Sequence, residues 1–463
     1  MHVVYAKQPF PESWTSAIFL AGPTPRDKTT PSWRGEALLL LEELGYDGVV
    51  FVPETADGNW APGPDAYVEQ IEWERRGLDA CDVAVFWVPR EMPATPARVG
   101  GPISDEARTM LKARGFNVIE DPAIYEDSGD GDLGPAWEPK TLADPDETTF
   151  YVPKVWSAGM PALTTNVEFG LYAASGKIVF GAPPEASSVR YLQSTLLRET
   201  GDGTRHRTLR STLEAAVARV GAGALRTGGE KEVPLHIWKT PAFQAWLASQ
   251  KAAGNRLDGA RLLWHFRIPK VNFIFSWVLH VRVWIAAEER HKENEYVFAR
   301  SDISTVCLYS WPSNLPDGLT DITDVEVVLI REFRSPGRTD DGFVHELAGG
   351  SSFKPGQDTL RVASEEVHEE TGLIIPASRF REVRSRQLAA TLSAHHAHLF
   401  AAELTQQEMA QARLLAESQE THGVVEDTER TYVEVTTLRE MLAGGLVDWS
   451  MIGMVAQAVL GSE

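Results

Sequence analysis

Three glutamates, Glu366, Glu369 and Glu370, have the spacing of a metal-binding helix face. Positions i, i+3 and i+4 of a helix lie on the same face, so the three carboxylates are expected to crowd together and repel one another. A hard divalent cation such as Mg2+ takes oxygen ligands, removes that repulsion and bridges to substrate phosphates. A Gly-rich stretch precedes the glutamates, and Gly372 follows them where a C-terminal helix cap belongs. The pattern predicts a metal-binding helix, and a solvated acidic helix face is the alternative.

The same stretch resembles the Nudix box, G-x5-E-x7-R-E-U-x-E-E-x-G-U, in which U is aliphatic. The matching residues are Glu366, Val367, Glu369, Glu370, Gly372 and Leu373. The resemblance implies that Glu366, Glu369 and Glu370 hold Mg2+ or Mn2+, and that Glu366 and Glu370 are catalytic. The chain departs from the box in having Glu365 at the Arg position, Gln357 at the first Glu position, and one extra residue after Gly350. These departures concern the rate of reaction, because the three metal-ligand positions are retained.

The segments around this box extend the resemblance. In chain order they are EVVLIREFRSP (326–336), FVHELAGG (343–350), HAHLFAAELT (396–405) and the stretch 429–460. Their order resembles the order of the corresponding segments in the ADP-ribose and nucleoside-diphosphate-sugar pyrophosphatases of the Nudix family. The resemblance places Arg331, Arg334 and Glu346 in the substrate pocket, where the planar fork of arginine suits phosphate. It also implies a general base from a later loop, for which the candidates are Glu417, Glu420, Glu426 and Glu429.

The first half of the chain alternates short apolar strands with helices. Strands are expected at 17–23, 48–54, 83–89 and 178–184, and helices at 33–45, 67–82 and 164–177. This alternation predicts an α/β fold with a doubly wound parallel sheet that is covered on both faces. Ligands bind such sheets at the carboxyl ends of the strands. Those ends carry Gly22-Pro23, the Pro53-Glu54 turn and the Pro89-Arg90-Glu91 turn.

Roughly residues 15–195 resemble the nucleoside 2-deoxyribosyltransferase-like family. The matching segments are IFLAGP, VFVPE, the W-E helix before LDACDVAVFWVPRE, and MPALTTNVEFGLYAASGK. The resemblance makes Glu168 the nucleophile that attacks the anomeric carbon of an N-glycoside and forms a glycosyl-enzyme ester. It places Asp82 as a second carboxylate near the sugar or base, and Asn166 where it orients Glu168 or binds a hydroxyl. An exposed helical acid is the alternative for Glu168, and a capping or turn role is the alternative for Asp82.

Three further residues of this half are expected to contact substrate: Gly22, Pro23 and Trp87. A purely conformational role for Gly22 and a core position for Trp87 are the alternatives. An insertion at about 95–158 separates the last two family segments and includes the acidic, Gly-rich run 126–134, which is interpreted as a lid or a partner-binding excursion. Ala162 stands where family members often carry an acid, so the acid and base assignment stays open.

The composition of the whole chain limits its partners. The 463 residues carry a formal net charge of −21, which argues against bulk nucleic acid and anionic membranes but is compatible with small phosphorylated substrates held by local arginines. Cys81 and Cys307 are the only cysteines, so no disulfide framework is expected and the compartment is predicted to be reducing and cytoplasmic. The predicted organisation is a first domain at 1–205, a linker at 206–233 and a Nudix domain at 234–463.

Two hypotheses of function follow. In the first, the chain is a bifunctional enzyme of nucleotide metabolism that acts on nucleosides, nucleotides or nucleotide sugars. It cleaves or transfers an N-glycosidic bond in the first domain without a cofactor, and it hydrolyses a nucleoside diphosphate linked to another group in the second, with Mg2+. In the second hypothesis one domain, more readily the divergent Nudix domain, is a nucleotide sensor and only the other is catalytic. A homo-oligomer is expected by resemblance.

Overall fold

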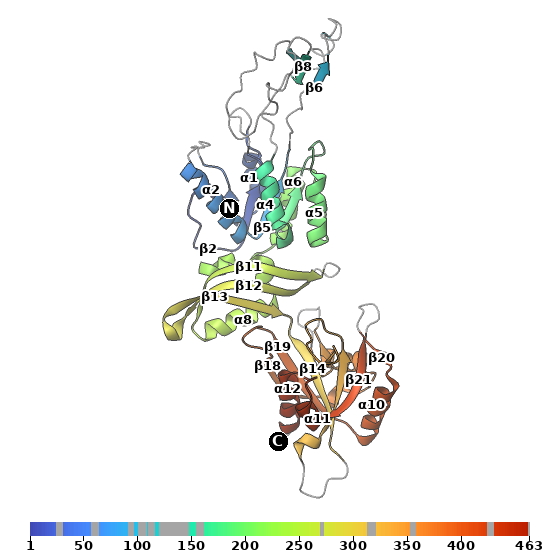
Figure 1. Ribbon diagram of the computed structural model, residues 1–463. Helices are drawn as coiled ribbons and strands as arrows, with labels where there is room; N and C mark the ends of the chain where they lie inside the picture. The colour runs from blue at the N-terminus through green and yellow to red at the C-terminus, as the bar shows by residue number, and fades with distance from the viewer. Residues whose placement is uncertain are drawn as a thin grey trace. The chain divides into compact units, whose positions relative to one another are not determined.

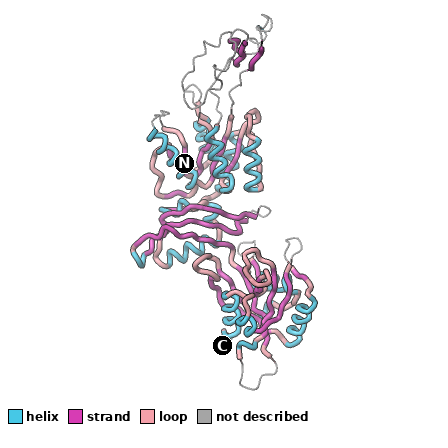
Figure 2. Tube along the Cα trace, viewed as in Figure 1, coloured by secondary structure: helices cyan, strands magenta, loops and turns pink. Residues whose placement is uncertain are grey.

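The computed structural model places most of the chain in two compact units, Met1–Thr227 (unit 1) and Gly228–Glu463 (unit 2) (Figures 1 and 2). The residues it describes are 1–24, 31–56, 64–90, 97–100, 109, 116–119, 148–153, 162–268, 273–312, 321–351, 358–423 and 430–461. None of the helices within these ranges is long and apolar enough to cross a membrane.

Unit 1 is built on a five-stranded parallel sheet with the order β1-β4-β3-β5-β9. The strands are β1 (His2–Tyr5), β3 (Ala17–Ala21), β4 (Val49–Val52), β5 (Val83–Trp87) and β9 (Ile178–Gly181). Every residue of β3, β4, β5 and β9 is buried, as expected for strands with helices on both faces. The parallel sheet predicted from the alternating pattern is therefore confirmed.

Helices cover both faces of this sheet (Figure 1). They are α1 (Trp33–Glu43), α2 (Pro64–Ala80), α4 (Leu163–Tyr172), α5 (Arg190–Thr200) and α6 (Leu209–Val220). On one face, Trp73 of α2, Phe169 of α4 and Leu192 of α5 pack on the strands in one buried cluster. On the other face, α6 packs on β5 and β9 and against α1. The chain adds β4 on one side of β3 and β5 on the other, so the carboxyl ends of β3 and β5 flank the switch point where such sheets bind ligands.

Residues 206–227, expected to be linker, lie within unit 1. Thr208 and Ser211 form a capping box at the start of α6, and Leu213 and Ala216 of that helix are buried. Beyond α6, β10 (Arg226–Thr227) pairs with β2 (Ser13–Trp14). The segment belongs to unit 1 because the apolar residues of α6 form a buried helix face, although glycines follow that helix.

The insertion expected at about 95–158 lies largely outside the described residues. Its described strands are β6 (Ala97–Gly100), β7 (Phe116–Ile119) and β8 (Thr148–Pro153). They form a three-stranded antiparallel sheet in the order β6-β8-β7. The run 126–134 is among the residues that the structure does not describe.

Unit 2 begins with short helices and a three-stranded antiparallel sheet. The helices are η5 (Gly228–Glu232), α7 (Leu235–Trp238) and α8 (Pro241–Ala252), and the strands are β11 (Arg256–Ile268), β12 (Phe273–Ile285) and β13 (Arg290–Arg300). In the middle of β12, the side chains alternate between deeper and shallower positions.

A larger mixed sheet follows, in the order β18-β19-β14-β15-β21-β20, with β16 on β15 and β17 on β14. The strands are β14 (Ile303–Ser310), β15 (Glu326–Glu332), β16 (Val344–Glu346), β17 (Gly349–Gly350), β18 (Arg381–Gln387), β19 (His396–Glu403), β20 (Thr421–His422) and β21 (Thr431–Thr437). Helices α9 (Thr359–Thr371) and α10 (Gln406–Ser418) contribute to the core on one face. Helices α11 (Leu438–Ala443) and α12 (Trp449–Leu460) contribute to the core on the other. The result is a three-layer α/β/α arrangement.

Candidate functional site

Glu168 of α4 forms a carboxyl pair with Glu74 of α2. The two carboxyls lie within hydrogen-bonding reach of each other, and a bond between them needs one proton. The contact raises the pKa of Glu168 and lowers that of Glu74, so the proton belongs on Glu168. Burial raises the pKa of both groups, and the neighbouring charge of Glu74 adds to the rise in the pKa of Glu168. Gln70, one turn before Glu74, donates to its Oε1 at 2.6 Å. The sequence predicted Glu168 as a site residue but assigned no role to Glu74.

Arg34 supplies the positive charge next to this pair. Its side chain is 2% exposed, and its Nη1 lies 2.5 Å from Oε1 of Glu54. The guanidinium also donates to the carbonyl oxygens of Leu20 at 2.9 Å and Gly22 at 2.6 Å, at the end of β3. Its charge acts on both carboxyls of the Glu74–Glu168 pair and opposes the rise in their pKa. Arg34 therefore ties the carboxyl end of β3 to that of β4 and helps to hold a proton-sharing pair beside them.

Gly22 follows β3 and lies against the backbone at the end of β5. Its φ is +147°, and a Cβ at this position would lie 2.2 Å from the carbonyl oxygen of Trp87. Only glycine fits such a position, so the conformational role weighed for Gly22 holds. The carbonyl of Pro23 accepts from the indole of Trp33 at 3.1 Å. Trp87 is 7% exposed and lies against Gly181, in the core position that was its alternative.

Asp82 is not brought to Glu168. It precedes β5 at the amino end of the sheet, whereas the carboxyl pair lies beside residues at the carboxyl ends. Its oxygens accept from Arg226 at 2.7 and 2.5 Å and from the backbone N–H of Ala17 at 2.8 Å. Asp82 is 4% exposed and Arg226 fully buried. The expected role near sugar or base is corrected to a buried ion pair, because the carboxylate faces a counter-ion that lies far away in the sequence.

Asn166 contacts Arg90, not Glu168. Its Oδ1 accepts a hydrogen bond from Nη2 of Arg90, whose Nη1 donates to the carbonyl of Ser188 at 3.0 Å. Asn166 and Glu168 lie two positions apart on α4, which turns their side chains to different sides of the helix. The helix thereby links the proton-sharing pair on one side to a buried arginine on the other.

The match to a known family covers the part of the chain that carries Arg34, Glu54 and Glu74. Residues 15–103 match the family model for nucleoside 2-deoxyribosyltransferase-like proteins. The match supports a deoxyribosyltransferase-like domain in the first part of unit 1. Members of this family act on small-molecule nucleosides. No curated protein matches the chain. Glu168 lies beyond the matched residues in the sequence, but the fold brings its side chain next to Glu74, which is one of them.

In unit 2 the structure brings Glu366 and Glu370 together. Glu370 is 5% exposed and accepts from the backbone N–H of Gly349 at 2.8 Å. Burial, and then the charge of Glu366, raise the pKa of Glu370 well above its usual range. A Cβ on Gly350 would lie 2.1 Å from Oε1 of Glu366, so this glycine lets the backbone approach the carboxylate. A buried and a half-buried carboxylate this close together suit a hard divalent cation that completes its shell with water or phosphate.

Glu369 does not join them as a third ligand. Its side chain is exposed, and across the described residues no three His, Cys, Asp or Glu side chains are arranged to hold a metal ion. Glu365, at the position of the family's arginine, is exposed and pairs with Arg361 at 2.8 Å. Gln357 lies outside the described residues. The structure thus unites two of the three expected metal ligands.

Arg334 and Glu346, both expected in the substrate pocket, meet each other. Nη2 of Arg334 lies 3.2 Å from Oε1 of Glu346 and 2.7 Å from Oε2 of Glu332. The charges of Glu346 and Arg334 both act on Glu370, so these residues border the carboxylate pair. Arg334 is therefore engaged by two acids next to Glu370.

Arg331 has a different setting. Its guanidinium lies over the rings of Phe343 and Tyr432, at 5.1 and 4.9 Å from their centroids. It donates to Oε1 of Gln419 at 3.1 Å and lies 3.7 Å from Glu434. Glu434 in turn contacts Nδ1 of His345 at 2.5 Å, a contact that sequence analysis did not predict. The ring contacts give Arg331 a packing role in addition to the expected substrate contact.

The later loop does not identify a base. Glu417 and Glu420 are exposed at the end of α10 and just beyond it, and Glu426 and Glu429 lie outside the described residues. The neighbouring histidines do not converge either: His398 lies 3.4 Å from Asp302, whereas Nδ1 of His396 contacts Ser385 at 3.0 Å.

Proposed function

We propose that unit 1 cleaves or transfers the N-glycosidic bond of a nucleoside-type substrate, with Glu168 as nucleophile and Glu74 as its proton partner. The observation that carries this proposal is the buried Glu74–Glu168 carboxyl pair, with Arg34 beside it at the carboxyl edge of the sheet. The match of residues 15–103 to the deoxyribosyltransferase-like family supports the same chemistry.

In the proposed reaction, the shared proton first passes from Glu168 to Glu74. The ionised Glu168 then attacks the anomeric carbon while the bond from that carbon to the base breaks. The bonding electrons leave with the base, which takes a proton from Glu74. This produces a glycosyl ester on Glu168 and an ionised Glu74. A water or a second base then attacks the same carbon, the ester bond breaks to regenerate the Glu168 carboxylate, and Glu74 recovers its proton from the attacking group. A pair that holds one proton between two carboxyls suits both half-reactions.

For unit 2 we propose Mg2+-dependent hydrolysis of a nucleoside diphosphate linked to another group, such as an ADP-ribose-like compound or a nucleotide sugar. Glu366 and Glu370 would hold the metal, which neutralises pyrophosphate charge when bound. Arg334, between Glu332 and Glu346, would exchange an acid for a substrate phosphate. The observation that favours this function is the raised pKa of buried Glu370 beside Glu366, because a cation relieves the cost of ionising both. A sensor that binds the same compounds without turnover is the alternative.

A product screen tests both proposals. Nucleosides, nucleotides and nucleotide sugars are offered to the full chain with and without Mg2+, and products are identified by mass spectrometry. We expect Glu168→Gln to lose release of free base only, and Glu370→Gln to lose release of nucleoside monophosphate only. The matched controls are Glu69→Gln on α2 and Glu365→Gln on α9, both exposed. Base release that survives Glu168→Gln contradicts the first proposal, and bound nucleotide without Mg2+-dependent turnover identifies unit 2 as the sensor.

A further inference from the structure

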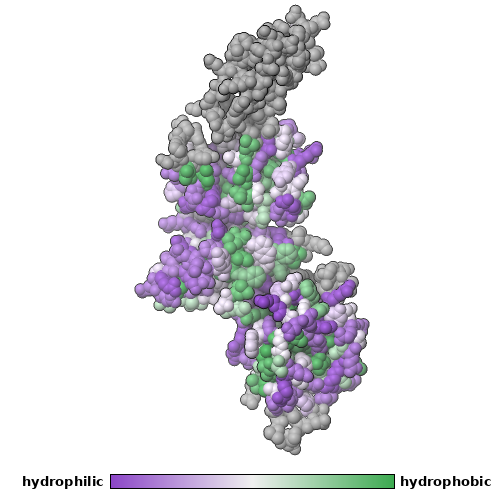
Figure 3. Space-filling model, viewed as in Figure 1, coloured by the Kyte–Doolittle hydropathy of each residue, from purple (hydrophilic) through white to green (hydrophobic). Residues whose placement is uncertain are grey.

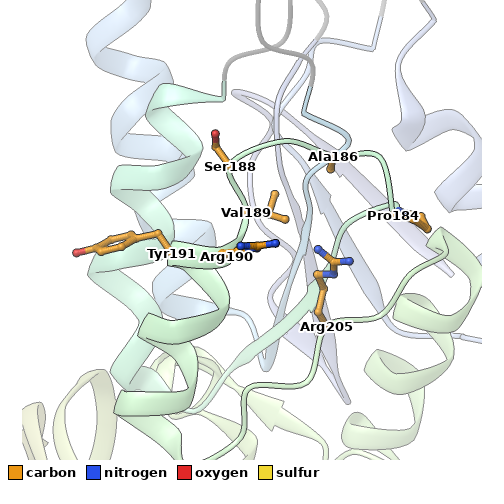
Figure 4. A pocket seen from close by; sticks show the side chains of 7 residues that line it. All are labelled: Pro184, Ala186, Ser188, Val189, Arg190, Tyr191 and Arg205. Carbon is orange, nitrogen blue, oxygen red and sulfur yellow. The ribbon is translucent and has the colours of Figure 1, made fainter.

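An open cavity of about 580 Å³ lies at the carboxyl end of β9, next to the start of α5. Its lining residues are Pro184, Ala186, Ser188, Val189, Arg190, Tyr191 and Arg205. Figure 4 shows the guanidinium ends of Arg190 and Arg205 pointing toward one another. Neither forms an ion pair with a carboxylate of the described residues, Glu185 of the same loop included. An anion between two positive charges that face each other over a cavity is attracted by both of them.

A third arginine lies behind the wall of this cavity. Arg90 is 6% exposed, and its acceptors among the described residues are the carbonyl of Ser188 and the amide oxygen of Asn166, which are both neutral. Its Nε has no hydrogen-bond partner among the described residues. Burial lowers the pKa of Arg90. Burying a guanidinium is costly unless an anion pairs with it, so Arg90 favours the binding of an anion on this side of the edge.

The strand order divides the carboxyl edge into an acidic half and a cationic half. Gly22 follows β3 and Glu54 follows β4, and these lie on the side of the Glu74–Glu168 pair. Arg90 follows β5, and the cavity follows β9, the next strand along. Helix α4 joins the halves, because its Glu168 pairs with Glu74 and its Asn166 with Arg90. A ligand along this edge therefore meets carboxyls at one end and arginines at the other.

We propose that Arg190 and Arg205, backed by Arg90, form a phosphate subsite, and that unit 1 acts on nucleoside 5′-monophosphates in preference to nucleosides. This inference rests on the proposed N-glycosidic chemistry of Glu168. Arginine forks bind phosphate oxygens in pairs, and two forks that converge suit a dianion. With a chain charge of −21, a nucleotide needs such a local cationic site to approach the edge. The cavity volume falls in the range that small ligands occupy.

The test compares matched pairs of substrates. The full chain and an Arg190→Ala/Arg205→Ala double variant are assayed for base release from each nucleoside 5′-monophosphate and from the same nucleoside without phosphate. We expect the double variant to lose roughly ten- to hundredfold in kcat/KM for the nucleotides and to be unchanged for the nucleosides, as for the loss of charge-assisted hydrogen bonds. Arg198→Ala is the control, because Arg198 lies on the same helix, is exposed and pairs with Glu199. Both substituted arginines lie at the cavity surface, so the fold is retained and circular dichroism verifies this.

A binding measurement separates this inference from the proposed function. Glu168→Gln, with and without the arginine substitutions, is titrated calorimetrically with nucleoside monophosphates, nucleosides and inorganic phosphate. Nucleotide binding that depends on the arginines, in a chain that releases no base from any substrate, supports the phosphate subsite and contradicts the glycosidic proposal. Equal kcat/KM for nucleosides and nucleotides, unaffected by the double variant, overturns the subsite and leaves the glycosidic proposal standing. Arginine-dependent binding of inorganic phosphate with no preference for nucleotide over nucleoside overturns the substrate assignment.

Discussion

Each unit of this chain holds a pair of close carboxyls, and the two pairs differ in what lies between them. Glu74 and Glu168 in unit 1 are hydrogen-bonded to each other and lie beside buried Arg34. Glu366 and Glu370 in unit 2 interact through their charges, with Gly349 donating to Glu370 and Gly350 close to Glu366. Burial raises the pKa of Glu168 and of Glu370 alike, so burial alone does not distinguish the chemistry.

The difference lies in how each pair relieves its repulsion. A shared proton relieves the first pair and makes it an acid and a base in one site. The second pair suits a cation, because two glycines bring backbone close to the carboxylates and the nearby Arg334 is engaged by two other acids. Two sites built from the same side chain thus favour proton transfer in one unit and metal binding in the other.

The largest expected effect concerns Asp82, a third buried carboxylate, which forms an ion pair with Arg226. Asp82→Asn leaves the buried guanidinium of Arg226 without its ion pair, so we expect the free energy of unfolding of unit 1 to fall by roughly 3 to 5 kcal/mol. Differential scanning calorimetry of the full chain measures this. Asp47→Asn, an exposed acid before β4, is the matched control and should leave the transition unchanged. An equal effect of both substitutions would show that Asp82 is not specifically paired.

Glu370→Gln is expected to act with the opposite sign. Because the folded state raises the pKa of Glu370, its contribution to stability is full below the unfolded pKa and is lost as pH rises through the folded one. In chelator at pH 8, removing the charge should therefore stabilise unit 2, on the order of 1 kcal/mol for each unit of pKa shift. Added Mg2+ should raise the Tm of the wild type and not that of the variant. If Glu370→Gln instead destabilises unit 2 in chelator, the predicted opposite sign relative to Asp82→Asn is contradicted.

The smallest effect is a shift in pH dependence. The charge of Glu74 contributes to the raised pKa of Glu168, so Glu74→Gln should lower that pKa and move the acid limb of the pH–rate profile for base release downward by roughly one pH unit. The rate itself should also fall, because the leaving base loses its proton donor. Glu69→Gln, exposed on the same helix, should leave the profile in place. An unshifted acid limb in Glu74→Gln would contradict the proton-sharing pair.

Local patterns predicted the parallel sheet of unit 1 and the helix that carries Glu366 and Glu370, because both depend on residues that are near one another in sequence. They also marked the turns that hold Glu54 and Arg90, since both follow a strand. The role of Asp82 was wrong, because its partner Arg226 lies 144 positions away and no local signal identifies it. Arg34 and Glu74 were missed for the same reason. The W-E helix contains Glu74, but only the fold brings it to Glu168.

Exposed apolar residues illustrate a further limit of sequence reasoning. Leu163, Val167 and Leu171 of α4 are 57%, 64% and 75% exposed, at a spacing that the sequence alone would assign to a core-facing stripe. Figure 3 shows apolar surface over this helix. The opposite side of α4 supplies Phe169 to the core, so the two faces of one apolar helix cannot be told apart from spacing. The expected homo-oligomer remains a prediction.

The most direct test of the central claim is to look for a sugar on Glu168. The full chain is mixed with nucleosides and nucleoside monophosphates, quenched in acid within the first turnover, digested and analysed by mass spectrometry. The account predicts that the peptide containing Glu168 gains the mass of the glycosyl group, and that Glu168→Gln shows neither the adduct nor release of base. Release of base by the wild type with the peptide unmodified, and the same release by Glu168→Gln, would contradict it.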